Sequence, residues 1–171
     1  FGPDRFTEPA LKLDEIPKTN LFLLTHNHYD HFDEQTIRAL KSKVEHFMVP
    51  IGNGQKLLDW GVERDKISEL DWWQTKTIGD LTLVATPANH ISGRMLFDQN
   101  EALWSSWVMI AKEQRIFFSG DGGYSDIFKN IGDKFGPFDL TMMENGAYDQ
   151  SWAMEHLMPT ETIQAHKDLK G

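Results

Sequence analysis

The chain has 171 residues and a formal net charge of −9, with 40% hydrophobic and 25% charged residues; this composition predicts one globular domain over residues 1–171 and excludes wholesale disorder. It contains no cysteine, which excludes disulfides, thiolate catalysis and cysteine metal ligands. The acidic balance argues against a nucleic-acid partner, and the sequence has no run of about 18 apolar residues that would form a transmembrane segment.

The first half of the chain is predicted to alternate short buried strands with helices. Residues 21–24 are all apolar and are typical of a buried strand. A helix is predicted over residues 34–42, with Asp33 as its N-cap and a single apolar face. Residues 47–49 are predicted to form a second strand, and residues 53–60 a second helix that ends at a glycine.

The second half is predicted to contain two hairpins. Residues 75–78 and 81–86 alternate in hydrophobicity, and the Gly-Asp pair between them suits a tight turn. Residues 103–111 and 115–119 are predicted to form the second hairpin, with its turn at residues 112–114. Strands in such clusters, with helices between and after them, predict a layered α/β domain.

The last third is predicted to end in two helices with a strand between them. Ser125 is the predicted N-cap of a helix that reaches residue 134 and stops at Gly136-Pro137. Residues 138–142 are predicted to form a strand. Pro159 suits the first turn of a final helix that runs to residue 169.

The strongest chemical pattern follows the first predicted strand, where His26, His28, Asp30 and His31 fall within six positions. Imidazole nitrogen and carboxylate oxygen are good ligands for zinc and neighbouring divalent metals. On extended backbone, histidines two positions apart point to the same side. Four titratable groups packed this closely would compete for protons unless they shared a metal ion.

Two further candidate ligands lie where other predicted strands end. His90 follows the strand over residues 81–86, and Asp121 follows the strand over residues 115–119 within a glycine-rich turn. Each of them alone is a weak indication. Because three strand ends would present metal-type ligands at one edge of the domain, we expect a metal site there.

The sequence around these residues resembles a known family. His26-x-His28-x-Asp30-His31, then His90, then Gly120-Asp121, is similar to the ordered ligand pattern of the metallo-β-lactamase fold superfamily. Within that superfamily, the sequence resembles the branch that contains N-acyl-phosphatidylethanolamine-hydrolysing phospholipase D. The segments that carry this resemblance are residues 25–31, 86–94, 119–124 and 135–140. The resemblance covers nearly the whole chain and implies a four-layer αββα sandwich.

The resemblance also implies a site with two divalent metal ions, zinc in the first instance and Mn²⁺ or Fe²⁺ as alternatives. His26, His28 and His90 would hold the first ion, Asp30 and His31 would hold the second, and Asp121 would bridge both. A metal-bound hydroxide would be the nucleophile, and Asp30 would help to orient it. His156 aligns with a family histidine that lines the active site, which makes it a candidate catalytic residue.

The implied activity is that of a metal-dependent hydrolase of a phosphodiester or related ester, phospholipase-D-like on N-acyl-phosphatidylethanolamine. A sugar-phosphate lactonase of the same superfamily and a non-catalytic metal-binding fragment are the alternatives. The expected partner is a small molecule or phospholipid, with peripheral membrane contact. Trp72-Trp73 and Trp104/Trp107 are candidates for that contact, and packing in the core or on a sheet is the competing interpretation, which we favour.

Two departures from the family pattern bear on completeness. The resemblance leads us to expect strands before the first motif, and a further strand after the last helix that carries one more histidine. We therefore expect a fragment with an incomplete fold; His166 is interpreted as a surface residue.

Residues 1–5 lack the features of a secretory signal, which favours a cytoplasmic location or the inner face of a membrane. A signal removed by processing would also suit a chain that opens on Phe. Tyr148 and Trp152 lie in a long loop that would cover the site.

Overall fold

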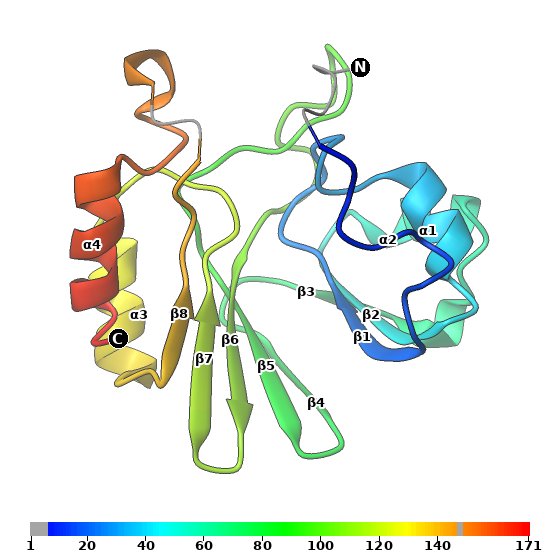
Figure 1. The fold of residues 1–171 in the computed structure, drawn as a ribbon, viewed down its shortest axis with the longest axis horizontal. Helices are drawn as coiled ribbons and strands as arrows, with labels where there is room; N and C mark the ends of the chain where they lie inside the picture. Colours follow the sequence, from blue (N-terminus) through cyan, green and yellow to red (C-terminus); the bar gives the residue numbers. More distant parts are fainter. Residues whose placement is uncertain (1–6, 147–148) are drawn as a thin grey trace.

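The computed structural model describes residues 7–146 and 149–171. In this part of the chain two β-sheets face each other, and each carries a pair of helices on its outer side (Figure 1). The layers run helix, sheet, sheet, helix, so the predicted αββα fold class is confirmed. Tyr148 and the first five residues lie outside the described residues.

The first sheet consists of three parallel strands joined by helical crossovers. Its elements in chain order are β1 (Thr19–Leu23), α1 (Glu34–Leu40), β2 (Val44–Pro50), α2 (Gly54–Asp59), the 3-10 helix η1 (Arg64–Lys66) and β3 (Ile67–Leu70). Asp33 begins α1 as predicted, because its side chain accepts a hydrogen bond from the Thr36 N–H at 2.7 Å. The helix ends at Leu40, earlier than predicted, because the chain turns there and Lys43 N–H donates to the Leu40 carbonyl oxygen at 2.8 Å.

The second sheet has five strands in chain order, antiparallel except for its last pair. The strands are β4 (Thr75–Ile78), β5 (Leu81–Thr86), β6 (Ser106–Ala111), β7 (Gln114–Phe118) and β8 (Leu140–Met142). Helix α3 (Ile127–Phe135) separates β7 from β8, and the 3-10 helix η2 (Gln150–Trp152) and α4 (Pro159–Asp168) follow. Both predicted hairpins are present.

Apolar side chains fill the space between the two sheets. Met48 from β2, Leu83 from β5 and Trp107 from β6 are fully buried there. Trp107 also donates from Nε1 to the Leu24 carbonyl oxygen at 2.8 Å, and Trp104 donates to the Ala88 carbonyl oxygen at the same distance. These two tryptophans therefore pack the sheets and the loops at their edge, which confirms the packing interpretation for them. Trp72 donates to the Trp104 carbonyl oxygen at 2.6 Å, whereas Trp73 is 40% exposed and does not belong to the core.

Several predicted element boundaries are wrong because contacts with distant segments decide them. Strand β3 escapes prediction because Ile-Ser-Glu-Leu contains no apolar run, and its pairing with β2 stabilises it. Strand β6 begins at Ser106 and not at residue 103, since the preceding backbone is bonded to other loops: Leu103 N–H donates to Ile51 and Ser105 N–H to Thr25. Helix α3 is a local exception: Asp126, not Ser125, is at its N-cap position, since the Asn130 N–H donates to the Asp126 carbonyl oxygen at 3.1 Å.

The arrangement of the strands positions the candidate site. Strands β1, β5 and β7 all end at the same edge of the sandwich, at the top of Figure 1. The loops that follow them carry His26, His90 and Asp121 respectively. Within the residues described, no helix has both the length and the apolar composition needed to cross a bilayer.

Candidate metal centre

The loop after β1 carries four of the predicted ligands and is shaped by its own hydrogen bonds. The N–H groups of His31 and Phe32 both donate to the carbonyl oxygen of His28, at 3.2 and 2.9 Å, which closes a tight turn. Oγ1 of Thr25 lies 3.0 Å from Nδ1 of His26. That contact fixes the buried imidazole of His26 with its Nε2 toward His28.

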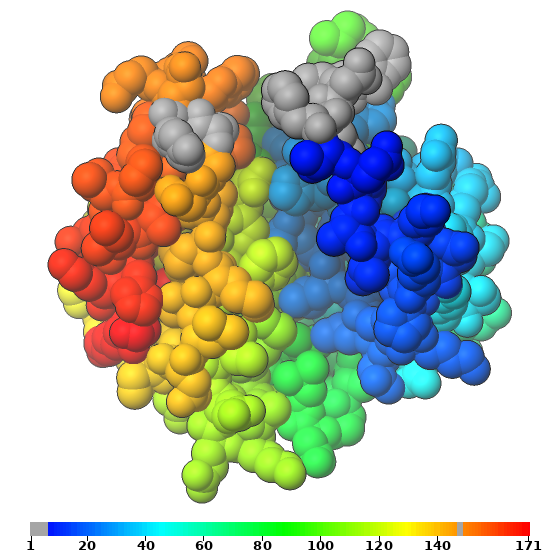
Figure 2. Space-filling view, viewed as in Figure 1, coloured from blue at the N-terminus to red at the C-terminus, as the bar shows by residue number. Residues whose placement is uncertain are grey.

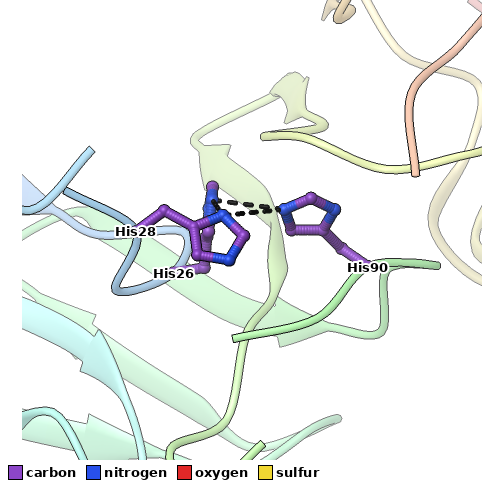
Figure 3. A group of neighbouring side chains, drawn as sticks. All are labelled: His26, His28 and His90. Atoms are coloured by element: carbon purple, nitrogen blue, oxygen red, sulfur yellow. Dashed lines mark hydrogen bonds between the residues drawn. The ribbon is translucent and has the colours of Figure 1, made fainter. Parts of the chain in front are cut away.

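Three imidazole nitrogens meet in a small triangle at the end of β1 (Figure 3). Nε2 of His26 lies 2.9 Å from Nδ1 of His28, and Nε2 of His90 lies 3.3 and 3.4 Å from these two atoms. A neutral imidazole nitrogen is either a donor or an acceptor. Among three nitrogens that face one another, at least two must be of the same kind, so hydrogen bonding cannot satisfy all three contacts.

A shared cation resolves this conflict, because all three nitrogens can then present lone pairs. Two ligands of a tetrahedral zinc ion, each about 2.1 Å from the metal, are about 3.4 Å apart. The observed separations of 2.9 to 3.4 Å are close to that value. Both the donor chemistry and the spacing of His26, His28 and His90 therefore fit a divalent metal.

A carboxylate links this triangle to a fourth histidine. Oδ2 of Asp121 lies 3.0 Å from Nε2 of His31 and 4.0 Å from Nε2 of His26. Oδ2 of Asp30 is 3.5 Å from Nε2 of His31, and the Asp30 side chain is 79% exposed. The structure thus brings Asp121 between the triangle and His31, and leaves Asp30 at the solvent-facing rim.

The charge state of these groups suits cation binding. Burial lowers the pKa of His26 to about 2 and that of His90 to about 4, and it also lowers the pKa of His28. Burial alone would raise the pKa of Asp121, but the hydrogen bond and charge of His31 outweigh it and lower this pKa to about 2. At neutral pH the triangle presents lone pairs beside an anionic carboxylate, which are the forms that ligate metals.

Glu144 is a residue near the site that the sequence analysis did not assign. It follows β8, and its Oε1 lies 2.5 Å from Nδ1 of His156, whose ring centroid is 5.7 Å from that of His90. Burial raises the pKa of Glu144. Asp121, Glu144 and His156 each have a potential ligand atom within 4.8 Å of the others, so His156 borders the donor cluster. His166 lies exposed on α4, as interpreted.

Arg94 joins the two loops that carry the histidines. Its Nη1 donates to the carbonyl oxygens of Asn27 and Phe32, at 2.9 and 2.7 Å. Its guanidinium carbon lies 4.1 Å from the centroid of the Tyr29 ring. The side-chain oxygen of Asn27 in turn accepts from the Gly93 N–H at 2.7 Å. These contacts hold the loop of His26 to His31 against the loop that follows His90.

A mostly apolar cleft of about 900 Å³ opens beside His28. Its lining includes the side chains of Tyr29, Ile91, Met95 and Leu96. At the tip of the same loop, Leu96 and Phe97 are 91% and 92% exposed. A smaller cavity of about 250 Å³ lies beside Asp30 and His31. Figure 2 shows the face of the molecule hollowed between the blue N-terminal segment and the orange segment before α4.

Two facing sheets with ligands gathered at the ends of β1, β5 and β7 define a metallo-β-lactamase-type fold. The chain belongs to the metallo-β-lactamase superfamily: the family described as "Beta-lactamase superfamily domain" matches residues 1–171. The predicted branch, which contains N-acyl-phosphatidylethanolamine-hydrolysing phospholipase D, is supported by the relatives described next.

The chain is similar to curated proteins along nearly its whole length. It is 42% identical over 169 residues to an uncharacterised protein of Mycobacterium tuberculosis, covering 98% of this chain and 45% of that protein. It is 35% identical over 183 residues to an N-acyl-phosphatidylethanolamine-hydrolyzing phospholipase D of Caenorhabditis elegans, covering 99% of this chain and 51% of that protein. The chain thus spans about half the length of these relatives.

The fold is shared with solved structures of low sequence identity. A metallo hydrolase from the archaeon Ignicoccus hospitalis superposes with a TM-score of 0.70 at 17% identity, over 90% of this chain and 60% of that one. At this level of identity the likeness establishes the fold alone. The chemistry must be argued from the site.

Proposed function

We propose that the protein to which this chain belongs is a metal-dependent hydrolase of a phosphodiester or related ester, with two divalent ions, zinc in the first instance. The triangle of His26, His28 and His90 nitrogens carries this proposal, because its three contacts cannot all be hydrogen bonds. Asp121 and His31 stand beside it at 3.0 Å from each other. A donor set of this kind suits zinc or a neighbouring divalent metal.

The roles of the ligands follow from their positions. His26, His28 and His90 would hold the first ion, Asp30 and His31 the second, and Asp121 would be shared. Divalent ions in such a site supply Lewis acidity and lower the pKa of water toward neutrality. Burial keeps the imidazoles of His26 and His90 neutral, and Arg94 fixes the loop that carries the first group.

Two side chains are proposed to act on the substrate and the attacking water. Asp30 lies at the rim, 3.5 Å from His31, where its exposed carboxylate can accept a hydrogen bond from water and orient it. His156 lies beside His90, with ring centroids 5.7 Å apart. From there it can hydrogen-bond to the substrate. We therefore assign catalytic roles to Asp30 and His156.

The cleft beside His28 favours a lipid substrate over a sugar phosphate. Its lining is largely apolar, and the exposed Leu96 and Phe97 lie on the same loop. A sugar-phosphate lactonase would need a basic pocket, but Arg94 is engaged by two carbonyl oxygens and the Tyr29 ring. The name of the nematode relative points to N-acyl-phosphatidylethanolamine. With that substrate the protein would work at a membrane surface, on the cytoplasmic side.

The test uses the full-length protein, with metal content measured on the same preparations. We expect metal-dependent hydrolysis of N-acyl-phosphatidylethanolamine in mixed micelles and of bis(p-nitrophenyl) phosphate, and no turnover of a sugar-phosphate lactone. His28→Ala should lose metal and at least 100-fold of the activity, since a ligand to the ion is removed. His166→Ala, at an exposed position on α4, is the matched control and should retain both. Bound metal without turnover of any substrate would instead support the non-catalytic alternative.

A further inference from the structure

Glu144 is held in place by two hydrogen bonds that tie it to the segment before α4. Oε1 pairs with Nδ1 of His156 at 2.5 Å, and Oε2 accepts from the Leu157 N–H at 2.8 Å. The Glu144 side chain is only 8% exposed. Both carboxylate oxygens of Glu144 are thus hydrogen-bonded, one to the ring of His156 and the other to the backbone of the next residue. Together these two bonds hold the His156 ring in one orientation relative to its own loop.

The direction of the first hydrogen bond fixes the tautomer of His156. A carboxylate can only accept, so Nδ1 of His156 must carry the proton. In a neutral imidazole the lone pair then resides on Nε2. The ring lies beside His90, with ring centroids 5.7 Å apart. Among the described residues no hydrogen bond to Nε2 is present, so this nitrogen is left to accept from another group beside the donor cluster.

We propose that Glu144 is a positioning residue: it fixes the orientation and the Nδ1–H tautomer of His156, so that Nε2 can accept a hydrogen bond from the substrate or the attacking water. For its effect on turnover this inference rests on the proposed hydrolase function. The tautomer itself can be measured without any turnover, so the two ideas can fail separately.

The competing interpretation is that Glu144 only orders the loop by accepting the Leu157 N–H. A nearby residue provides the matched control for this interpretation. Glu161, in the first turn of α4, also accepts a backbone hydrogen bond: its Oε2 accepts from the Met158 N–H at 2.9 Å. Glu161 is not hydrogen-bonded to His156 in the described part of the chain. A loop-ordering role predicts that Glu144→Gln and Glu161→Gln have similar effects.

The Glu144→Gln variant makes the sharpest test because it is nearly isosteric. The Leu157 N–H is a fixed donor, so the amide oxygen of glutamine should pair with it. The amide NH₂ then faces Nδ1 of His156 and needs an acceptor there. The substitution should therefore move the imidazole proton from Nδ1 to Nε2, whereas Glu161→Gln should leave it on Nδ1.

The experiment is ¹⁵N NMR of the histidine rings in the full-length protein loaded with diamagnetic Zn²⁺. We expect His156 of the wild type to carry its proton on Nδ1, and Glu144→Gln to carry it on Nε2 with unchanged zinc content. Turnover of N-acyl-phosphatidylethanolamine should show a kcat lowered on the order of 100-fold in Glu144→Gln, with KM nearly unchanged.

Three results would overturn the inference. They are a proton on Nε2 in the wild type, the same tautomer in Glu144→Gln as in the wild type, or an equal loss of kcat in Glu161→Gln. A wild-type protein with the expected tautomer but no hydrolase activity would overturn the proposed function and leave the positioning of His156 standing.

Discussion

Gly120 packs directly against the side chain of Thr25, and this contact joins the two strand ends that carry Asp121 and His26. A Cβ atom at Gly120 would lie 2.7 Å from Cγ2 and 2.8 Å from Cβ of Thr25. Gly120 also has a φ of +61°, in the left-handed region that glycine adopts most readily. Thr25 is in turn 3.0 Å from Nδ1 of His26. The separation of the two ligand loops thus depends on the missing side chain at residue 120.

Gly120→Ala should destabilise the protein and weaken its metal site. Gly79→Ala is the matched control, since Gly79 has a φ of +56° and a methyl group added there would meet none of the described residues within 4 Å. The left-handed backbone should cost both variants about 1–2 kcal/mol. The clash with Thr25 should add about 1–3 kcal/mol at Gly120 alone and lower zinc affinity about 10–100-fold. Urea unfolding and zinc titration measure both quantities; equal effects of the two substitutions would contradict the account.

Local sequence patterns predicted most of the helices and strands because their stabilising contacts are local or periodic. Asp33 caps α1, and the apolar Ile37 and Leu40 face the core three residues apart. The hairpin of β4 and β5 could be predicted from its alternation and its Gly-Asp turn. Strand β3 could not, because its stability depends on pairing with β2 and its own four residues alternate poorly.

Arg94→Lys should loosen the ligand loop, because a lysine cannot replace both hydrogen bonds to Asn27 and Phe32 and the stacking on Tyr29. Loss of charged hydrogen bonds to buried carbonyls should cost about 1–3 kcal/mol of unfolding free energy. Arg64→Lys, at an exposed arginine of η1 with no side-chain hydrogen bond among the described residues, should cost less than about 0.5 kcal/mol. Hydrogen exchange should show faster opening of residues 25–32 in Arg94→Lys alone. Unchanged protection of that loop would show that Arg94 does not hold it.

The candidate site was predictable where the ligands are close in sequence and follow strands. His26, His28 and His31 lie close together in the sequence, so their spacing alone indicated a shared site. His90 and Asp121 could be added to that site because each of them also directly follows a predicted strand. Glu144 could not be found in this way. It lies twelve positions before His156 in the sequence, and a single acidic residue in a long loop has no periodic pattern that distinguishes it.

The hydrogen bond from Tyr124 to Asp168 should make stability depend on alkaline pH. This bond, 2.5 Å long, raises the pKa of Tyr124 to about 12, above the value of about 10 for an unfolded chain. The contribution of this hydrogen bond to the free energy of unfolding is fully present below pH 10. It is lost as pH rises from about 10 to 12, because the phenol of Tyr124 ionises in that range only in the unfolded chain. Urea unfolding should show the stability difference between wild type and Tyr124→Phe narrowing over this range. Tyr29→Phe is the control, and a constant difference for Tyr124→Phe would refute the coupling.

Chelation should destabilise the wild-type protein and have no effect on the variant that lacks a triangle ligand. Metal bound only to the folded state adds about 2.7 kcal/mol when the free ion is at 100 times its Kd. In His28→Ala the ion has lost one nitrogen of the triangle, so thermal unfolding with and without EDTA should nearly coincide. In His166→Ala the full EDTA effect should persist. A full EDTA effect in His28→Ala would place the stabilising ion elsewhere.

Whether the imidazoles of His26, His28 and His90 share a metal ion can be seen by anomalous X-ray diffraction at the zinc edge, from crystals of the full-length protein purified with its metal. We expect an anomalous peak bonded to Nε2 of His26, Nδ1 of His28 and Nε2 of His90, and a second peak beside His31, with Asp121 between the two. Density that shows these three imidazoles in contact with no metal, in crystals grown with zinc present, would contradict it.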